Sequence, residues 1–186
     1  MNDLSDKPIP NPLSKKQMKD RIIRVDHAGE YGAVRIYQGQ LAVFGDHHPL
    51  SDTIKHMKEQ EDVHLERFNT LIRENKTRPT LITPFWHVAG FALGAGTALL
   101  GPKAAMACTE AVEEVIDDHY AQQINYLNKD KTESALAKEL EKFRQEEIEH
   151  KQTAIDNGAQ ETPAHGLLYG MIKIGVKTAI KIAERI

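Results

Sequence analysis

The sequence has one cysteine and no marked excess of either charge. A single thiol, Cys108, cannot form a disulfide within the chain and is typical of a reducing compartment. Its neighbours Ala104, Met106 and Ala107 are apolar, which favours a small buried side chain over a nucleophile. The 24 basic and 27 acidic residues give a formal net charge of −3, and this near balance argues against a nucleic-acid-binding protein.

The N-terminal segment lacks the features of a targeting signal. Residues Met1–Leu13 are polar, contain three prolines, and have no apolar core of a secretory signal. They are neither rich in arginine nor free of acidic residues, as a mitochondrial transit peptide would be. We expect residues 1–15 to be a flexible segment and residues 16–186 to form one domain, in a bacterial protein or a mature organellar one.

Strict alternation of apolar and polar residues is rare, whereas apolar residues recur every three or four positions over long stretches. This pattern predicts an all-α protein. The expected helices are Lys16–Gly45, Ser51–Glu74, Lys103–Leu127, Glu133–Asp156 and a last apolar helix after Pro163.

The segment Thr80–Gly101 has no Asp, Glu, Lys or Arg over 22 residues. Its length would allow a membrane span, but Pro84 and four glycines leave it only mildly hydrophobic. The composition favours a helix pair that is buried or lies on a membrane. Gly90 and Gly94 would let this segment approach another helix closely.

The last helix carries apolar residues together with Lys173, Lys177, Lys181 and Arg185. A basic amphipathic helix of this kind often lies on an anionic membrane surface. A helix packed on the protein with a solvated lysine face explains the pattern equally well.

Two Glu-x-x-His pairs, Glu61/His64 and Glu147/His150, lie on the second and fourth of the four long helices. Residues three apart share a helix face, so each pair can converge on one metal ion. Alone, such a pair is a weak signal.

Two further glutamates strengthen the signal. Glu30 lies on an apolar stripe of the first long helix, and Glu113 lies among apolar residues of the third. The order Glu, Glu-x-x-His, Glu, Glu-x-x-His indicates two similar helix pairs related by a pseudo-twofold axis. It is the ligand inventory of a di-iron carboxylate site in a four-helix bundle. The alternative, solvated side chains on helix surfaces, suits a single glutamate better than four glutamates and two histidines in this order.

Two polar residues near the proposed ligands, Asp26 and Tyr120, each allow two interpretations. Asp26, one turn before Glu30, is either an acceptor for the N–H of a ligand histidine or a solvent-facing carboxylate. Tyr120 either packs in the core or returns to the metal-facing stripe, where it would donate a hydrogen bond or relay an electron. Glu114 and Glu146 are expected to point away from the site. The histidines without a partner at ligand spacing are expected to be solvated: His27, His47, His48, His56 and His165.

Four motifs resemble the demethoxyubiquinone hydroxylase family, the Coq7/Cat5 proteins. They are Arg24–Ala33, Gly90–Gly101, Ala105–Thr109 and Val112–Glu114, and the resemblance runs from Ile22 to the C-terminus. It implies a ferritin-like four-helix bundle with a di-iron centre and additional membrane-associated helices. It also implies an O₂-dependent monooxygenase that hydroxylates the ring of 5-demethoxyubiquinol in ubiquinone biosynthesis.

The resemblance assigns the metal ligands and the cofactors. It favours Glu113 over Glu114, and it implies two iron ions per chain with O₂ as co-substrate. The sequence has no flavin or dinucleotide-binding fingerprint, so electrons are expected from an external donor, which the resemblance suggests is NADH. The implied ligands are Glu30, Glu61, His64, Glu113, Glu147 and His150.

The implied substrate is a lipid quinone whose polyprenyl tail resides in the bilayer. We therefore expect peripheral association, on the cytoplasmic face of a bacterial inner membrane or the matrix face of the mitochondrial one, with other ubiquinone-biosynthesis proteins as partners. Thr80–Gly101 and the last helix are the expected membrane segments, and Phe85 and Trp86 are either interfacial anchors or core residues. The rival hypotheses are a ferritin-like iron oxidase or storage protein and a non-enzymatic lipid-binding helical protein.

Overall fold

The computed structural model describes residues 13–129 and 133–185, and these residues form α-helices and no β-strand. The prediction of an all-α protein is confirmed. Of the segment 1–15 that was expected to be flexible, residues 1–12 lie outside the described residues. The helices are α1 (Lys15–Phe44), α2 (Ser51–Asn75), α3 (Thr83–Leu99), α4 (Pro102–Asn128), α5 (Ser134–Asp156), a short 3-10 helix (Ala159–Glu161) and α6 (His165–Ala183).

Local sequence sets several helix ends. The Ser14 side chain accepts a hydrogen bond from the Gln17 backbone N–H, and the Gln17 side chain accepts one from Ser14, which forms a capping box at the start of α1. Gly45 ends α1 at φ 68°, and Gly101 separates α3 from α4 at φ 119°. Only glycine adopts such angles without strain, so the chain turns at these positions.

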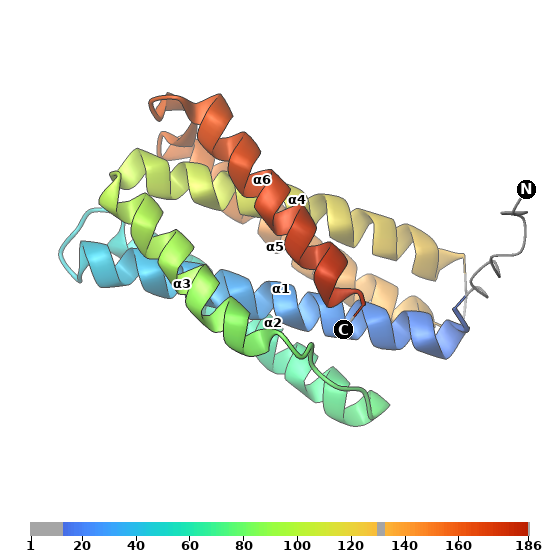
Figure 1. Ribbon diagram of the computed structural model, residues 1–186. Helices are drawn as coiled ribbons and strands as arrows, with labels where there is room; N and C mark the ends of the chain where they lie inside the picture. The colour runs from blue at the N-terminus through green and yellow to red at the C-terminus, as the bar shows by residue number, and fades with distance from the viewer. Residues whose placement is uncertain (1–12, 130–132, 186) are drawn as a thin grey trace, which may run out of the picture.

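The same arrangement, a pair of helices with a third helix packed on the first of the pair, occurs twice. α1 and α2 pack as one pair and α4 and α5 as another, while α3 packs along α1 and α6 along α4 (Figure 1). The six predicted metal ligands lie near the middle of α1, α2, α4 and α5. The core continues on both sides of them, with Ile23, Phe68 and Leu140 in one cluster and Tyr37 and Met106 in the other.

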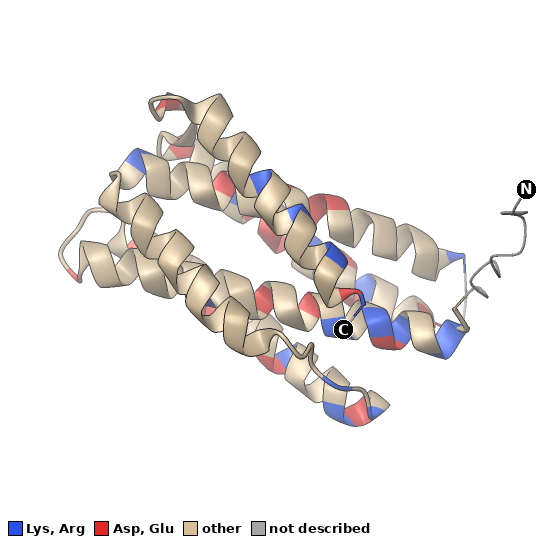
Figure 2. Cartoon of the chain, viewed as in Figure 1, with Lys and Arg blue, Asp and Glu red and all other residues tan. Residues whose placement is uncertain are grey.

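The uncharged stretch forms one helix, α3, and not the expected helix pair. Pro84 lies in its first turn, where a helix needs no backbone N–H donor, so proline begins α3 instead of interrupting it. Figure 2 shows no charged residue along α3. Over the described residues, no helix is both long enough and apolar enough to cross a membrane.

Glycines let α3 lie directly against α1, as predicted for Gly90 and Gly94. A Cβ added at Gly94 would collide with the backbone of Ile36, and one at Gly39 would collide with the backbone of Phe91. A Cβ at Gly90 would lie 2.9 Å from Cβ of Arg35. This close contact fixes α3 on the outer side of the helix that carries Glu30.

Large apolar side chains remain exposed along α3 and α6, which both lie on the near side in Figure 1. We call them the α3/α6 surface. Phe85 belongs to it, whereas Trp86 is partly buried against Val25, Ala28 and Ala183. The members are Leu81, Phe85, Val88, Leu99, Leu100, Leu167, Met171, Ile174 and Ile182.

Candidate metal centre

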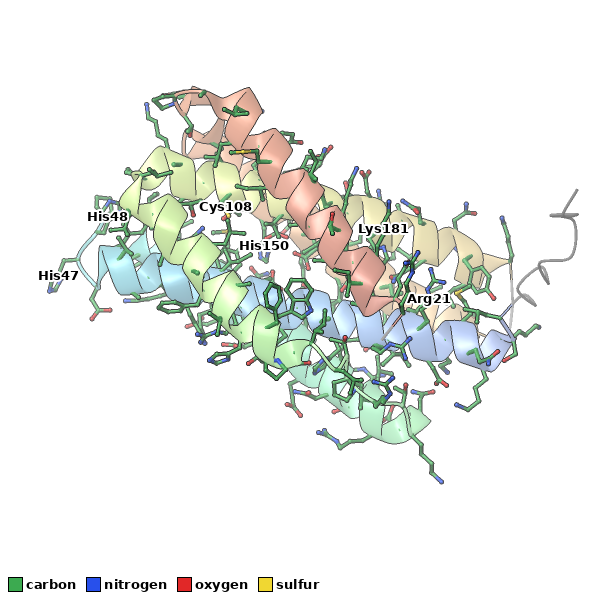
Figure 3. All side chains as sticks on the ribbon, in the orientation of Figure 1. Arg21, His47, His48, Cys108, His150 and Lys181 are labelled. Atoms are coloured by element: carbon green, nitrogen blue, oxygen red, sulfur yellow. The ribbon has the colours of Figure 1, made fainter. Side chains whose placement is uncertain are left out.

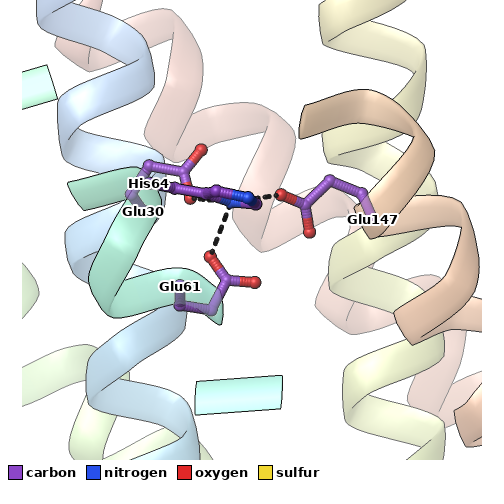
Figure 4. A group of neighbouring side chains, drawn as sticks. All are labelled: Glu30, Glu61, His64 and Glu147. Carbon is purple, nitrogen blue, oxygen red and sulfur yellow. Dashed lines mark ion pairs between the residues drawn. The ribbon is translucent and has the colours of Figure 1, made fainter. Parts of the chain in front are cut away.

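Six acidic and histidine side chains from four helices meet in the interior. They form two overlapping groups in which the candidate ligand atoms lie within 4.8 Å of one another. Figure 4 shows the first group, and in Figure 3 the label His150 marks the second. All six predicted residues are therefore brought together and buried. The groups are Glu30, Glu61, His64 and Glu147, and Glu61, Glu113, Glu147 and His150.

Glu61 and Glu147 belong to both groups. Nδ1 of His64 lies 3.8 Å from Oε2 of Glu61 and 3.2 Å from Oε1 of Glu147. Nδ1 of His150 lies 3.1 Å from Oε1 of Glu61 and 3.3 Å from Oε2 of Glu147. Each shared carboxylate thus presents one oxygen to each histidine, so it could contribute to both metal positions.

The inward-facing atoms of the cluster lack hydrogen-bond partners among the described residues. They are both oxygens of Glu61 and of Glu147, Nδ1 of His64 and His150, and one oxygen each of Glu30 and Glu113. Buried polar atoms are costly when unpaired, so a group of them facing one point needs an explanation. Metal ions supply one, because oxygen and imidazole ligands suit iron.

Electrostatics supports this fit. Burial and the charge of Glu147 raise the pKa of Glu61 and the pKa of Glu113 well above their usual range. Burial lowers the pKa of His64, but its contacts with Glu147 and Glu30 outweigh burial and raise that pKa to about 11. Burial also opposes ionisation of Glu147, yet His150 and His64 hold its pKa at about 2. Burial thus disfavours negative charge on Glu61 and Glu113, and bound cations would offset that cost while competing with protons for the same ligand atoms.

Comparison with known proteins agrees with the family resemblance seen in the sequence. The family model described as "Ubiquinone biosynthesis protein COQ7" matches residues 17–183. The chain belongs to the COQ7 family. The "3-demethoxyubiquinol 3-hydroxylase" of Rhodospirillum rubrum is 52% identical over 178 residues, covering 96% of this chain and 83% of the relative.

Mitochondrial relatives of this COQ7-family chain are also similar. The "NADPH-dependent 3-demethoxyubiquinone 3-hydroxylase, mitochondrial" of Homo sapiens is 50% identical over 169 residues, covering 90% of this chain and 77% of that protein. The "5-demethoxyubiquinone hydroxylase, mitochondrial" of Saccharomyces cerevisiae is 42% identical over 181 residues, covering 90% and 78%. The family resemblance predicted from the motifs is confirmed.

Glu30 and Glu113 each belong to only one of the two groups, and we call them the outer carboxylates. Each of them accepts a hydrogen bond from a tyrosine. Tyr120 on α4 donates a hydrogen bond to Glu30 on α1, as one interpretation of the sequence predicted. Tyr37 on α1 donates to Oε1 of Glu113 on α4 at 2.7 Å. Sequence reasoning missed Tyr37, although it follows Glu30 at the same spacing of seven residues at which Tyr120 follows Glu113.

The outer ring nitrogens of the two histidines have different partners. Nε2 of His64 lies 2.5 Å from Oε2 of Glu146, and Nε2 of His150 lies 3.1 Å from Oε1 of Gln60. The expectation that Glu146 points away from the site is wrong, because this side chain reaches across from α5 to α2. Glu114 does face outward, where it accepts a hydrogen bond from Lys151 at 3.0 Å.

Asp26 does not accept a hydrogen bond from either predicted ligand histidine. Its Oδ1 accepts one from Gln123 at 2.6 Å, and Gln123 also contacts His119. It is not solvent-facing either, since it is 4% exposed and burial raises its pKa well above the usual range. Both interpretations of Asp26 are therefore wrong: a buried polar network on the α1/α4 side contains it.

One histidine expected to be solvated is buried, and another is half-buried. His27 is buried, contacts Asn69 at 3.0 Å and lines a cavity of about 510 Å³ with Tyr31 and Leu65. His165 at the start of α6 contacts the buried Glu110 at 2.7 Å. By contrast, His47 and His48 lie in the turn between α1 and α2, at the end of the molecule (Figure 3).

Proposed function

We propose that this chain is an O₂-dependent di-iron monooxygenase, a 3-demethoxyubiquinol 3-hydroxylase. Its substrate would be 5-demethoxyubiquinol, 2-polyprenyl-3-methyl-6-methoxy-1,4-benzoquinol, and hydroxylation of the ring would be its step in ubiquinone biosynthesis. The observation that carries this proposal is the buried cluster of six side chains with unpartnered inward-facing atoms, in a chain of this family. The names of the relatives support the choice of substrate.

Each side chain has a role in this proposal. Glu61 and Glu147 would help to hold both iron ions, Glu30 and His64 would hold one of them, and Glu113 and His150 would hold the other. The bound irons would supply the activation of O₂. Tyr37 and Tyr120 orient the outer carboxylates, and the apolar core excludes water from the centre.

The proposed architecture is a ferritin-like four-helix bundle of α1, α2, α4 and α5. It fits the ligand order, with one Glu from each of two helices and a Glu-x-x-His from each of the others. In this proposal α3 and α6 are additional helices of the same domain, residues 16–186. Their exposed apolar residues argue against the rival hypothesis of a soluble storage protein.

The electrons would come from outside the chain. We expected NADH from the family resemblance, whereas the printed names of the mitochondrial relatives say "NADPH-dependent". A reduced nicotinamide nucleotide fits both. Steady-state rates measured with NADH and with NADPH at equal concentration would distinguish the two donors.

The proposal includes peripheral membrane association through the α3/α6 surface. Exposed apolar side chains there are accompanied by exposed Lys177 and Lys181, a combination suited to an anionic bilayer. Such a position would give the centre access to a quinone whose tail stays in the bilayer. The expected locations are the cytoplasmic face of a bacterial inner membrane or the matrix face of the mitochondrial one, with other ubiquinone-biosynthesis proteins as partners.

Metal content and turnover test this function together. The purified chain should contain two irons and convert demethoxyubiquinol with O₂ and a reductant. Glu147→Ala should lose both irons and all turnover, because it removes a shared carboxylate. Glu149→Ala, an exposed carboxylate on the same helix, should retain both. A chain with two irons and no conversion would contradict the proposed reaction, and a chain that binds no metal would favour the non-enzymatic rival.

A further inference from the structure

We propose that the two metal positions are unequal: the position at His64 binds its ion more tightly than the position at His150 and fills first. The inference rests on the proposed di-iron centre. It concerns the residues behind the ligands, Glu146 and Gln60, which act on the metal only through the histidines.

The direct ligands of the two positions are matched. Each position has one histidine, one outer glutamate and a share of Glu61 and Glu147. Each outer glutamate accepts a hydrogen bond from one tyrosine of the opposite helix pair. Both histidines face the centre with Nδ1 and away from it with Nε2. The ligands themselves therefore give no reason for one position to bind better.

The acceptors behind the histidines occupy equivalent places in the two helix pairs. Glu146 immediately precedes Glu147, and Gln60 immediately precedes Glu61. Each reaches to the histidine of the other Glu-x-x-His helix, so Glu146 on α5 contacts His64 and Gln60 on α2 contacts His150. The pseudo-twofold relation is broken at this pair, because one acceptor is a carboxylate and the other is an amide.

The difference between the carboxylate and the amide acceptor predicts which position binds its metal ion more tightly. A carboxylate that accepts the N–H of a ligand histidine makes the other ring nitrogen a stronger donor to the metal, and loss of such a partner typically costs about 10- to 100-fold in metal affinity. Glu146 approaches Nε2 of His64 more closely, at 2.5 Å, than Gln60 approaches Nε2 of His150, at 3.1 Å. This order is the one expected when one acceptor is a carboxylate and the other a neutral amide, because hydrogen bonds to ionised acceptors are the shorter ones. Lys142 lies 3.6 Å from the other oxygen of Glu146 and is mostly exposed, so solvent weakens its opposing effect.

Titration of the metal-free protein with Co²⁺, followed by calorimetry and visible absorption, tests the inference. Wild type should bind two ions in separate steps with affinities about 10- to 100-fold apart. Glu146→Gln, which copies the acceptor of the other position, should weaken the first step and bring the two together. Gln60→Glu should strengthen the second step. Glu149→Gln removes an exposed charge from the same helix and should leave both steps unchanged.

The order of filling has its own measurement. Anomalous diffraction from crystals with one equivalent of Co²⁺ should locate the ion beside His64 in wild type and beside His150 in the double variant Gln60→Glu, Glu146→Gln. Equal steps in wild type, steps that Glu146→Gln does not change, or an ion first beside His150 would overturn the inference while leaving a two-metal centre in place. Failure of wild type to bind Co²⁺ would overturn the proposed centre itself.

Discussion

At the scale of single residues, the two tyrosine hydroxyls select which oxygen of each outer carboxylate faces the metal positions. Tyr37 donates to Oε1 of Glu113 and Tyr120 to Oε1 of Glu30, while Oε2 of each carboxylate accepts no hydrogen bond. Oε2 of Glu30 instead lies 3.4 Å from Nδ1 of His64. Both tyrosines are almost fully buried, so water cannot replace them as donors. Their hydrogen bonds therefore stabilise the fold and also orient the cluster.

We expect Tyr37→Phe to destabilise the protein by about 1–3 kcal/mol, because a buried carboxyl oxygen loses its donor while the ring volume is kept. Urea denaturation of the metal-free protein measures this free energy of unfolding. Tyr126→Phe is the matched control, since Tyr126 is 38% exposed. Equal stability of the two variants would contradict a structural role for the Tyr37 hydroxyl.

Four of the six proposed ligands could be found from the sequence because spacing along one helix determines which side chains share a face, whereas Glu30 was indicated by its apolar surroundings and Glu113 was chosen over Glu114 by the family resemblance. Glu61/His64 and Glu147/His150 are local patterns of this kind. The contacts of Glu146 with His64 and of Asp26 with Gln123 join different helices, and no spacing within one helix encodes them. Tyr37 was within reach, because it repeats the spacing of Tyr120.

At the scale of helices, α3 depends on contact between backbones. It has no charged residue and leaves several apolar side chains exposed, so its position is set by glycines that fit against α1. The sequence indicated this contact at Gly90 and Gly94. It did not indicate a single helix, because a proline within an apolar stretch can either end one helix or begin another.

We expect Gly94→Ala to lower the free energy of unfolding by about 1–3 kcal/mol, as for other substitutions that overfill a packed contact. The added Cβ would meet the backbone of Ile36, which cannot rotate away as a side chain could. Gly96→Ala on the same helix meets nothing within 4 Å. It should be neutral or stabilise by up to about 1 kcal/mol, since alanine favours helix. Thermal unfolding of both variants measures the contrast, and equal losses would contradict it.

At the scale of the whole molecule, α3 and α6 both leave large apolar side chains exposed, and these make up the α3/α6 surface. We expect the chain to sediment with anionic phospholipid vesicles and the double variant Met171→Ser, Ile174→Ser to bind them at least about tenfold more weakly, since burial of each side chain contributes about 1.5–3 kcal/mol. Val63→Ser on α2 removes an exposed apolar residue outside this surface and should bind like wild type. Equal binding by all three proteins would contradict the proposed membrane face.

The stability of the whole metal-free molecule should depend on pH through the buried cluster. The pKa values of Glu61 and Glu113 are raised above the ordinary 4.5, so above that pH the folded chain keeps protons that the unfolded chain releases. The same holds for His64 between 6.5 and about 11. Both effects lower the free energy of unfolding as pH rises. Glu147 acts in the opposite sense, but only between its pKa of about 2 and 4.5.

Bound metal should reverse this dependence, because cations replace the retained protons and binding strengthens as the ligands lose them. We therefore expect the difference in Tm between metal-loaded and metal-free protein to grow from pH 6 to pH 8. Differential scanning calorimetry of both forms at equal ionic strength measures it. In this range the metal-free protein alone should lose stability, since the pKa of His64 is raised from 6.5 to about 11. A difference that stays constant or shrinks would mean that the cluster does not exchange protons for metal.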